Sequence, residues 1–389
     1  MIDKTRYNCS GCSACLNICP RKCIEMHPDA LGFIYPKVDP SKCINCHLCD
    51  KVCDFNDNYS KIGNYNEPLA FAARHKNYEE LKGSRSGAVF VAISDWILAN
   101  GGVVYGAGFK HHFVVTHKRA VNRRQRDEFR GAKYVQSDIS GILTSIANDL
   151  QEGTIVLFVG TPCQVNGLKS FLRIKKIDMT NLYLCDIICH GVGSPKIWQD
   201  YLAYLENKNH RPIISVNFRD KKYGWNSHHE TFLFENKTQP IDCKQVFYNN
   251  IILRYSCYSC PFSNTTRTGD ITIGDFWGWE KIIPSEFNSD DLGVSIILVN
   301  NDKGNSILSA ISDQLHLIST TIADAIQPNL QHPTEKPYNR DDFESDCISK
   351  STVYAMQKYG LLTKRQNFLT KYGKAVIRRF AKSVKHLNK

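Results

Sequence analysis

The distribution of apolar and polar residues from Leu69 onward predicts an α/β arrangement of helices and strands. Residues 86–99 form an apolar-rich helix candidate that the glycine pair at 101–102 ends. Residues 154–159 form a continuous apolar run of the kind found in buried parallel strands. The other predicted helices are residues 139–150, a segment ending near Leu172, 195–206 and 306–315. The other predicted strands are residues 103–105, 113–116, 182–188, 213–218, 230–234, 271–273 and 294–299.

The C-terminal residues 364–389 carry nine basic and no acidic side chains, with apolar residues three and four positions apart between them. This pattern is typical of a basic amphipathic helix, which either docks on the protein by its apolar stripe or lies on an anionic membrane surface. Much of the net charge of +11 resides in this tail. The body of the protein is therefore not predicted to be a nucleic-acid surface, and we expect no nucleic-acid partner.

The length and hydropathy of the chain limit its possible domain organisation and its relation to membranes. Its 389 residues suffice for a small domain and one large domain. The most apolar region, residues 87–109, is interrupted by polar residues and glycines, so no membrane span is expected. No secretory signal precedes the cysteines, which predicts reduced thiols and a cytoplasmic protein, with the tail as a candidate peripheral contact at the inner membrane face.

Nine of the sixteen cysteines lie within the first 53 residues, and eight of them form one pattern written twice. Each run has the spacing C-x2-C-x2-C-x3-C, which is typical of two-cluster ferredoxins, where the fourth cysteine of each run binds the other cluster. We therefore assign one [4Fe–4S] cluster to Cys9, Cys12, Cys15 and Cys53, and a second to Cys43, Cys46, Cys49 and Cys19. Zinc is the alternative, but zinc sites use two cysteine pairs separated by a spacer. The leftover Cys23 is expected to be a small buried residue near the cluster.

Four further cysteines fall at predicted strand ends or tight turns: Cys163, Cys189, Cys257 and Cys260. They could bind a third [4Fe–4S] cluster, while the C-x2-C pair alone also suits zinc or a redox-active dithiol. Cys185 is an alternative to Cys189, but it lies within an apolar strand rather than at its exit. Cys243 and Cys347 are predicted to be ordinary packed cysteines.

The order of several motifs resembles the coenzyme F420 hydrogenase/dehydrogenase beta-subunit family from about residue 70 to 340. These motifs are Ser84-x-Ser86-Gly87-Ala88, Gly131-x-Lys133-Tyr134-Val135-Gln136-Ser137, Gly160-Thr161-Pro162-Cys163-Gln164, Cys189-His190-Gly191, Phe218-Arg219-Asp220-Lys221, and a C-x2-C pair followed by residues 269–278, GDITIGDFWG. The resemblance implies an FAD held in the α/β domain and an adjacent [4Fe–4S] cluster at Cys163, Cys189, Cys257 and Cys260. The family's usual Ser-Gly-Gly is Ser86-Gly87-Ala88 here, and the added methyl weakens this segment as a flavin contact.

Candidate cofactor contacts follow from turn chemistry. Gly160 and Thr161 offer backbone amides at a strand-to-helix turn, which suits a phosphate group. The remaining candidates are Ser84, Ser86, Gly87, Lys133, Ser137 and Gln164, and each could instead serve as an ordinary turn or cap residue. His190 is the candidate catalytic proton donor, or else a structural hydrogen-bonding residue. Arg219 and Lys221 could bind an anionic substrate, although a solvated strand edge is the favoured prediction for them.

The predicted fold class is α+β, in which a dicluster ferredoxin module precedes a larger mixed α/β flavin-binding domain and a basic helical C-terminal tail. The expected bounds are residues 1–56 for the module, 57–68 for a linker, 69–340 for the α/β domain and 341–389 for the tail.

These features predict an iron–sulfur flavoprotein oxidoreductase. It would take electrons from a donor such as ferredoxin or a reductase, and pass them through the N-terminal clusters, the third cluster and FAD to a small-molecule or lipid-linked organic substrate. The resemblance suggests surface-polysaccharide biosynthesis as its setting. The alternative is an electron-transfer beta subunit of a larger hydrogenase or dehydrogenase complex, with coenzyme F420 as a candidate partner. A third hypothesis is a scaffold that the clusters only stabilise.

Overall fold

A computed structural model of the chain describes residues 2, 4–55, 64–242, 246–283, 287 and 290–362. Most of the predicted linker, Cys243 and the predicted basic helix from residue 364 lie outside the described residues. Among the helices of the described part, none is both long and apolar enough to cross a membrane.

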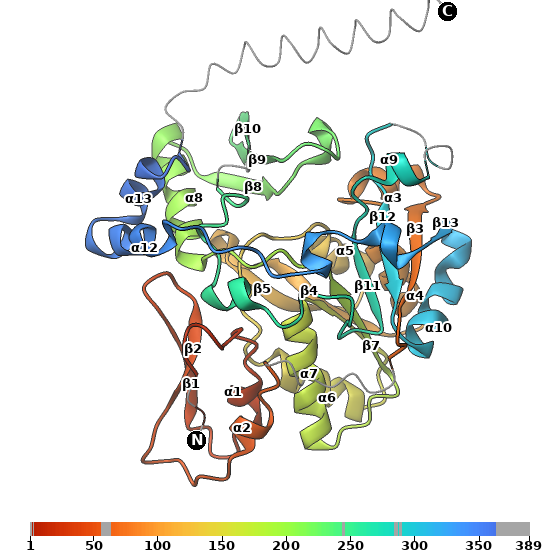
Figure 1. The fold of residues 1–389 in the computed structure, drawn as a ribbon, viewed down its shortest axis with the longest axis horizontal. Helices are drawn as coiled ribbons and strands as arrows, with labels where there is room; N and C mark the ends of the chain where they lie inside the picture. The colour runs from red at the N-terminus through yellow and green to blue at the C-terminus, as the bar shows by residue number, and fades with distance from the viewer. Residues whose placement is uncertain are drawn as a thin grey trace, which may run out of the picture.

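The N-terminal module is a small unit of two helices and one antiparallel strand pair, at the red end of the chain in Figure 1. Its elements are α1 (Ala14–Ile18), β1 (Ile24–Pro28), β2 (Ile34–Val38) and α2 (Leu48–Lys51). Each helix follows a residue with left-handed backbone, Ser13 (φ 58°) before α1 and His47 (φ 57°) before α2. The duplicated cysteine run therefore forms the same turn twice.

The larger domain is built on a mixed sheet with the strand order β13-β3-β12-β11-β7-β6-β4-β5. Its four central strands, β11, β7, β6 and β4, are parallel, while the strands outside them pair antiparallel. The strands are β3 (Leu69–His75), β4 (Val103–Phe109), β5 (Val115–Ala120), β6 (Val156–Gly160), β7 (Leu182–Ile187), β11 (Ile271–Asp275), β12 (Ser295–Val299) and β13 (Leu315–Thr320). The parallel strands end at one edge of the sheet, which is where α/β proteins form their binding sites.

Helices cover both faces of this sheet (Figure 1). Helices α6 (Ile142–Gln151) and α7 (Pro162–Lys175) share a core with one face of the sheet and with the N-terminal module, whose Ile18 and Val52 are buried there. Helices α4 (Val89–Ala99) and α10 (Asp302–Ile311) share a core with the opposite face. The short helices are α3 (Tyr78–Gly83), α5 (Arg123–Arg126), α9 (Trp279–Ile282) and α11 (Ile322–Ala325), with 3-10 turns at His111–Phe113, Asp127–Phe129, Lys221–Tyr223, Tyr255–Ser259, Ser312–Gln314 and Pro328–Leu330.

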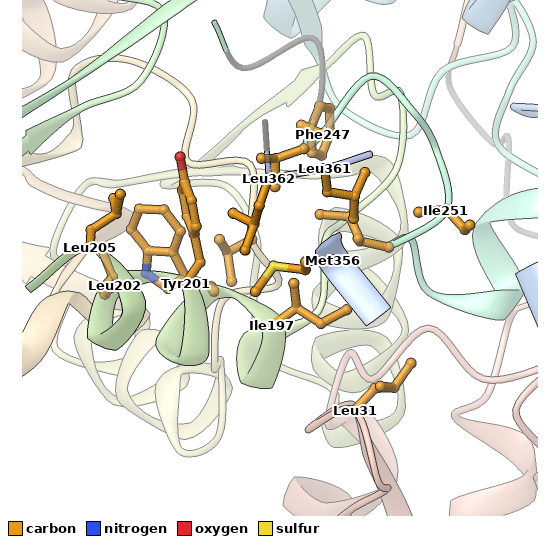
Figure 2. Packing of buried hydrophobic residues seen from close by; sticks show 14 of the residues in the cluster. Leu31, Ile197, Tyr201, Leu202, Leu205, Phe247, Ile251, Met356, Leu361 and Leu362 are labelled. Carbon is orange, nitrogen blue, oxygen red and sulfur yellow. The ribbon is translucent and has the colours of Figure 1, made fainter. Parts of the chain in front are cut away.

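A second sheet forms a separate apolar core beside the first. Strands β8 (Ile213–Asn217), β9 (His229–Phe234) and β10 (Lys237–Asp242) pair antiparallel. Their core includes α8 (Pro195–Asn209), α12 (Arg340–Ser349) and α13 (Thr352–Lys358), and Figure 2 shows Ile197 and Tyr201 of α8 near Met356 of α13. Leu31 of the N-terminal module belongs to the same core, so two apolar cores hold the module against the body.

A buried ion pair links β7 to the segment that precedes β11. Arg267 and Asp186 are both almost fully buried, with Arg267 Nη2 3.0 Å from Asp186 Oδ1. The other carboxylate oxygen of Asp186 accepts hydrogen bonds from the backbone N–H groups of Thr268 and Gly269. This fully hydrogen-bonded pair fixes the residues 260–270 segment against the end of β7.

Several elements differ from the sequence-based prediction. Strands β3, β10 and β13 were not predicted, whereas helices α12 and α13 lie in the part of the chain predicted as a helical tail. The helix expected at 306–315 begins at Asp302 and ends at Ile311, because Leu315 already starts edge strand β13. The strand expected at 113–116 begins at Val115, after a 3-10 turn. The first part of the predicted basic tail forms α12, which carries Asp341, Asp342 and Glu344 and packs on the body.

Candidate iron–sulfur centres and cofactor cavity

The cysteines of the module line two separate small cavities. One is lined by Cys9, Cys12, Cys15 and Cys53. The other is lined by Cys19, Cys23, Cys43, Cys46 and Cys49. The fourth cysteine of each run therefore lies with the first three of the other run, which is the grouping expected for two crossed clusters. Cys46 is exposed, so the second cavity lies near the surface of the module.

Cys23 is buried beside the second cavity, and its sulfur lies 3.4 Å from that of Cys19. From the sequence, Cys23 was expected to be a small buried residue near the cluster, and this matches its position. The sequence did not indicate that Cys23 lies close enough to the site to serve as a fifth thiol. Cys347 is buried in the core of α8, α12 and α13, away from these cavities.

The third group of cysteines meets at the carboxyl ends of the parallel strands. Cys163 lies in the first turn of α7, Cys189 follows β7, and Cys257 and Cys260 lie in and just after a 3-10 turn. Burial raises the pKa of Cys189 well above its usual value, and charges on Cys257, Cys163 and Cys260 would raise it further, which shows that the four thiols are neighbours. Cys185, the alternative, instead points into the core between the sheet and α4.

Burial makes these thiols weak acids in the metal-free protein. It raises the pKa of Cys257 to about 12 and that of Cys260 to about 11, each with a further contribution from neighbouring cysteines. A bound metal stabilises the thiolate form, so cluster insertion and loss of these protons would be coupled.

The first module cavity and the third group adjoin each other across α7. Cys163 is among the groups whose charge would raise the pKa of Cys12, after burial and the cysteines of the module. Gly167 in α7 lies so close to Cys12 that an added Cβ would be 2.9 Å from its Sγ. The absent side chain at Gly167 thus permits close approach of the two cysteine groups.

Arg254 supplies a buried positive charge at this junction, and its side chain is fully buried. Its guanidinium donates to the backbone oxygens of Cys9 (2.7 Å) and Ile34 (2.9 Å) and to Gln136 Oε1 (2.8 Å), all neutral acceptors. Within the described ranges it has no carboxylate partner. A buried charge needs a counter-charge, and tetrathiolate clusters carry net negative charge, so the residues present fit anionic clusters on both sides of Arg254.

Single-ion sites are a separate matter. Among the described residues, no group of three or more His, Cys, Asp or Glu side chains is arranged to hold one metal ion. In a cubane each thiolate binds a different iron atom, so its ligands surround a space instead of converging on one point.

A cavity of about 480 Å³ lies next to the third cysteine group, at the carboxyl ends of β6, β7 and β11. Its volume lies within the range typical of small-molecule and cofactor pockets. Cys189 and His190 line it, so the third cysteine group reaches the cavity wall. The other predicted cofactor residues that line it are Ser84, Ser86, Lys133, Ser137, Gly160, Thr161 and Gln164.

Gly87 is the predicted contact that does not line the cavity. Its N–H donates to Ser295 Oγ at 2.9 Å, and an added Cβ would overlap the Ala73 carbonyl oxygen. Gly87 therefore permits close packing against β3 and β12. The next residue, Ala88, does line the cavity and has left-handed backbone (φ 64°), which explains why a glycine suits this position in the family pattern.

Three of the lining side chains are held by specific hydrogen bonds. Lys133 Nζ donates to the backbone oxygens of Glu128 and Arg130, and burial lowers its pKa to about 7. Gln164 accepts from the Thr161 N–H (3.0 Å) and donates to Ser137 Oγ (2.9 Å). The two Gln164 contacts fix the turn between β6 and α7.

His190 is also held on both sides. Its Nδ1 lies 3.2 Å from Asn329 Oδ1 and its Nε2 lies 2.6 Å from Asn250 Oδ1. Neutral imidazole donates from one nitrogen only, so in that state one of the two amides would have to present its NH₂ group. The ring is thus well positioned at the wall, and proton donation by His190 would require it to break one of these bonds.

Sequence reasoning was wrong about Arg219, which is not on a solvated strand edge. It is 3% exposed, lines the cavity and pairs with Asp275 at 2.6 Å. Lys221 is absent from the lining, and it donates to the backbone oxygens of Leu81 and Ser86. Among the lining residues that sequence reasoning missed are Arg85, Asp275 and Trp277. The last two lie in the GDFWG block, which was recognised only as a family motif.

Comparison with known proteins finds a family match for each of two segments of the chain. Residues 153–325 match the family described as the C terminus of the coenzyme F420 hydrogenase/dehydrogenase beta subunit, and residues 8–56 match the "4Fe-4S dicluster domain". The chain is therefore related to coenzyme F420 hydrogenase/dehydrogenase beta subunits over residues 153–325, and it carries an iron–sulfur dicluster domain at residues 8–56.

Two individual relatives add detail. An uncharacterised polyferredoxin-like protein of Methanocaldococcus jannaschii is 34% identical over 62 residues, which cover 14% of this chain and 37% of the relative. The chain thus spans about a third of the length of that relative. A chain in a structure of the F420-reducing [NiFe] hydrogenase complex from Methanosarcina barkeri is 18% identical, with a TM-score of 0.46, covering 77% of this chain and 92% of that one.

Proposed function

We propose that this chain is an electron-transfer subunit that conducts single electrons between a partner protein and a flavin held in the 480 Å³ cavity. One observation carries the proposal: the three cysteine groups and the cavity form a contiguous series. The series begins at exposed Cys46, whose group includes Cys19 at the end of α1. Helix α1 also carries Cys15 of the first group, and this group adjoins Cys163 across α7. It ends at Cys189 in the cavity wall.

When bound, iron–sulfur clusters accept and release one electron at a time and a flavin takes one or two, so the two together convert single electrons into a two-electron reduction. The chain's own residues would position these groups. Arg254 and Ser256 both donate to the Cys9 carbonyl oxygen, which anchors the first cysteine run to the segment that carries Cys257. The four cysteines of the third group are half-buried, and Cys189 reaches the cavity wall.

The family match favours a subunit over a self-contained enzyme. The beta-subunit description covers the part of the chain that contains Cys163, Cys189, Cys257 and Cys260, and we propose a larger hydrogenase or dehydrogenase as the partner. Coenzyme F420 is a candidate two-electron acceptor at the cavity. Affinity purification of the tagged, full-length chain from its native host tests this proposal: recovery with a large catalytic subunit supports it, and a stable active monomer contradicts it.

The second candidate function is reduction of an organic substrate by this chain alone. The observation that favours it is the size of the cavity, which provides a wall of basic and aromatic side chains beside any flavin. The described lining residues do not select a sugar or a lipid-linked sugar, so the proposal names neither.

The rate of flavin reduction by reduced ferredoxin tests the electron path. We expect Cys46→Ser to slow this reaction strongly, because it removes a ligand of the outermost group. Cys347→Ser, which changes a cysteine buried in another core, is the matched control and should reduce its flavin at the wild-type rate. An unchanged rate in Cys46→Ser would show that electrons enter elsewhere.

A further inference from the structure

The lining of the cavity carries more positive than negative charge. Four basic side chains line the cavity (Arg85, Arg130, Lys133 and Arg219), and Asp275 is the one carboxylate among the lining residues that the structure describes. Arg130 is paired with Glu80 and Asp127 outside the cavity. Arg219 pairs with Asp275 inside the cavity, and the hydrogen-bond partners of Arg85 among the described residues are backbone oxygens.

Arg85 and Arg219 lie side by side. Both donate to the Trp225 carbonyl oxygen, Arg85 Nη2 at 2.6 Å and Arg219 Nη2 at 3.4 Å. The positive charge of Arg219 contributes, after burial, to a lowered pKa of Arg85, at about 10. Two guanidinium groups therefore share one region of the cavity wall, where their positive charges repel each other.

Asp275 cannot neutralise both arginines. Its Oδ2 accepts from Arg219 Nη1 at 2.6 Å, and its Oδ1 accepts from Trp225 Nε1 at 2.9 Å. Arg219 also lies over the Trp277 ring, with 5.0 Å from the guanidinium carbon to the ring centroid. Both oxygens of the carboxylate are thus occupied, and Arg85 has no carboxylate among its hydrogen-bond partners in the described ranges.

Several donors in this corner have no partner among the described residues. They are Arg85 Nε, Arg85 Nη1, Arg219 Nε and the hydroxyl of Ser84, all buried. A buried donor without an acceptor is costly, and more so when it belongs to a charged group. A ligand that offers several anionic oxygens would satisfy these donors together.

We propose that Arg85, Arg219 and Ser84 form an oxyanion subsite for a phosphate or pyrophosphate group. The forked guanidinium binds phosphate oxygens in pairs, and the hydroxyl adds a third donor. The proposal rests on the proposed function, because it assigns part of the same cavity. The group belongs either to the pyrophosphate of a dinucleotide cofactor or to a phosphorylated second ligand.

Calorimetric titration of the flavin-free, full-length protein with inorganic pyrophosphate tests the subsite. We expect Arg85→Gln to weaken pyrophosphate binding about ten- to a hundredfold, the effect of losing charged hydrogen bonds. Arg85→Lys keeps the charge and should retain part of the affinity. Arg123→Gln, at a 70% exposed arginine side chain paired with Asp95, should bind as wild type does. Thermal melting of each variant verifies that it folds.

The same titration of flavin-loaded protein distinguishes the two sources. Binding that disappears on flavin loading assigns the subsite to the cofactor, and binding that persists assigns it to a second ligand. Equal affinity of wild type and Arg85→Gln, or no binding by wild type, would overturn the subsite. If Arg85-dependent binding is found but the Cys46→Ser variant reduces its flavin normally, the electron path fails and the subsite stands.

Discussion

Gly87 shows at the residue scale how packing can be mistaken for a ligand contact. Its neighbours Ser86 and Ala88 line the cavity, whereas Gly87 faces the Ala73 carbonyl oxygen and Ser295. Its role is therefore expected to be independent of any flavin.

Gly87→Ala is predicted to destabilise the protein by about 1–3 kcal/mol or more, because the new methyl overpacks a site bounded by backbone. The loss should be equal with and without flavin in urea unfolding. Gly101→Ala is the control: that glycine has φ 72° and open space around it, so only the left-handed backbone penalty of about 1–2 kcal/mol applies. A loss seen only in flavin-loaded protein would instead indicate a cofactor contact.

A second prediction at the scale of single residues concerns Arg254. A buried positive charge beside a cluster favours the reduced state, which carries the additional negative charge. Arg254→Gln should therefore lower the midpoint potential of the nearest clusters, whereas Arg254→Lys should leave it closer to wild type. Redox titration followed by electron paramagnetic resonance measures both. Identical potentials in all three proteins would contradict the assigned counter-charge.

The buried thiols predict that the stability of the cluster-free protein depends on pH. Burial raises the pKa of Cys12 and of Cys257 to about 12 in the folded state, from 9.0 for the free thiol. Above pH 9 the unfolded thiols ionise while the folded ones stay neutral, so the free energy of unfolding should fall as pH rises from 9 toward 12. Urea unfolding at pH 8, 9 and 10 measures this fall. A Cys12→Ser/Cys257→Ser double variant should show a shallower dependence, and an equal slope would be evidence against the raised pKa values.

At the scale of elements, the strands and turns that could be predicted are those that a short stretch of sequence specifies by itself. Strands β6 and β7 were predicted because continuous apolar runs mark central parallel strands, and the turn after β6 was predicted as a site because strand ends hold ligands. Edge strand β13 lacks such a run, because polar residues interrupt its sequence LHLIST. Arg85, Arg219 and Asp275 come from distant segments, and only the folded chain brings them together.

Helix α7 lies between the module and the cavity, and its Gly167 packs against Cys12 of the module. Alanine is ordinarily better than glycine in a helix by about 1 kcal/mol. Here the added Cβ would lie 2.9 Å from both Cβ and Sγ of Cys12. Gly167→Ala should therefore lower the iron content of the purified protein and slow electron transfer to the cavity. Lys175→Ala, at an exposed position of the same helix, should change neither. Full iron content in Gly167→Ala would show that Cys12 tolerates the displacement.

At the scale of the whole molecule, the module is an integral part of the fold. It contributes to two apolar cores, and Arg254 joins it to the larger domain through the backbone of residues 9 and 34. The matched family descriptions cover the module and residues 153–325, and the structure describes how the remaining residues complete the sheet. A fixed geometry between cysteine groups suits electron transfer, which depends on close and constant spacing of the centres.

The central claim is that three cysteine groups bind clusters in series up to the cavity. Iron and acid-labile sulfide content of anaerobically purified protein tests it most directly, with a Cys257→Ser/Cys260→Ser double variant for comparison. Three [4Fe–4S] clusters predict about twelve irons per wild-type chain and about eight in the variant. About eight irons in both proteins would contradict the third cluster and break the proposed path between the module and the cavity.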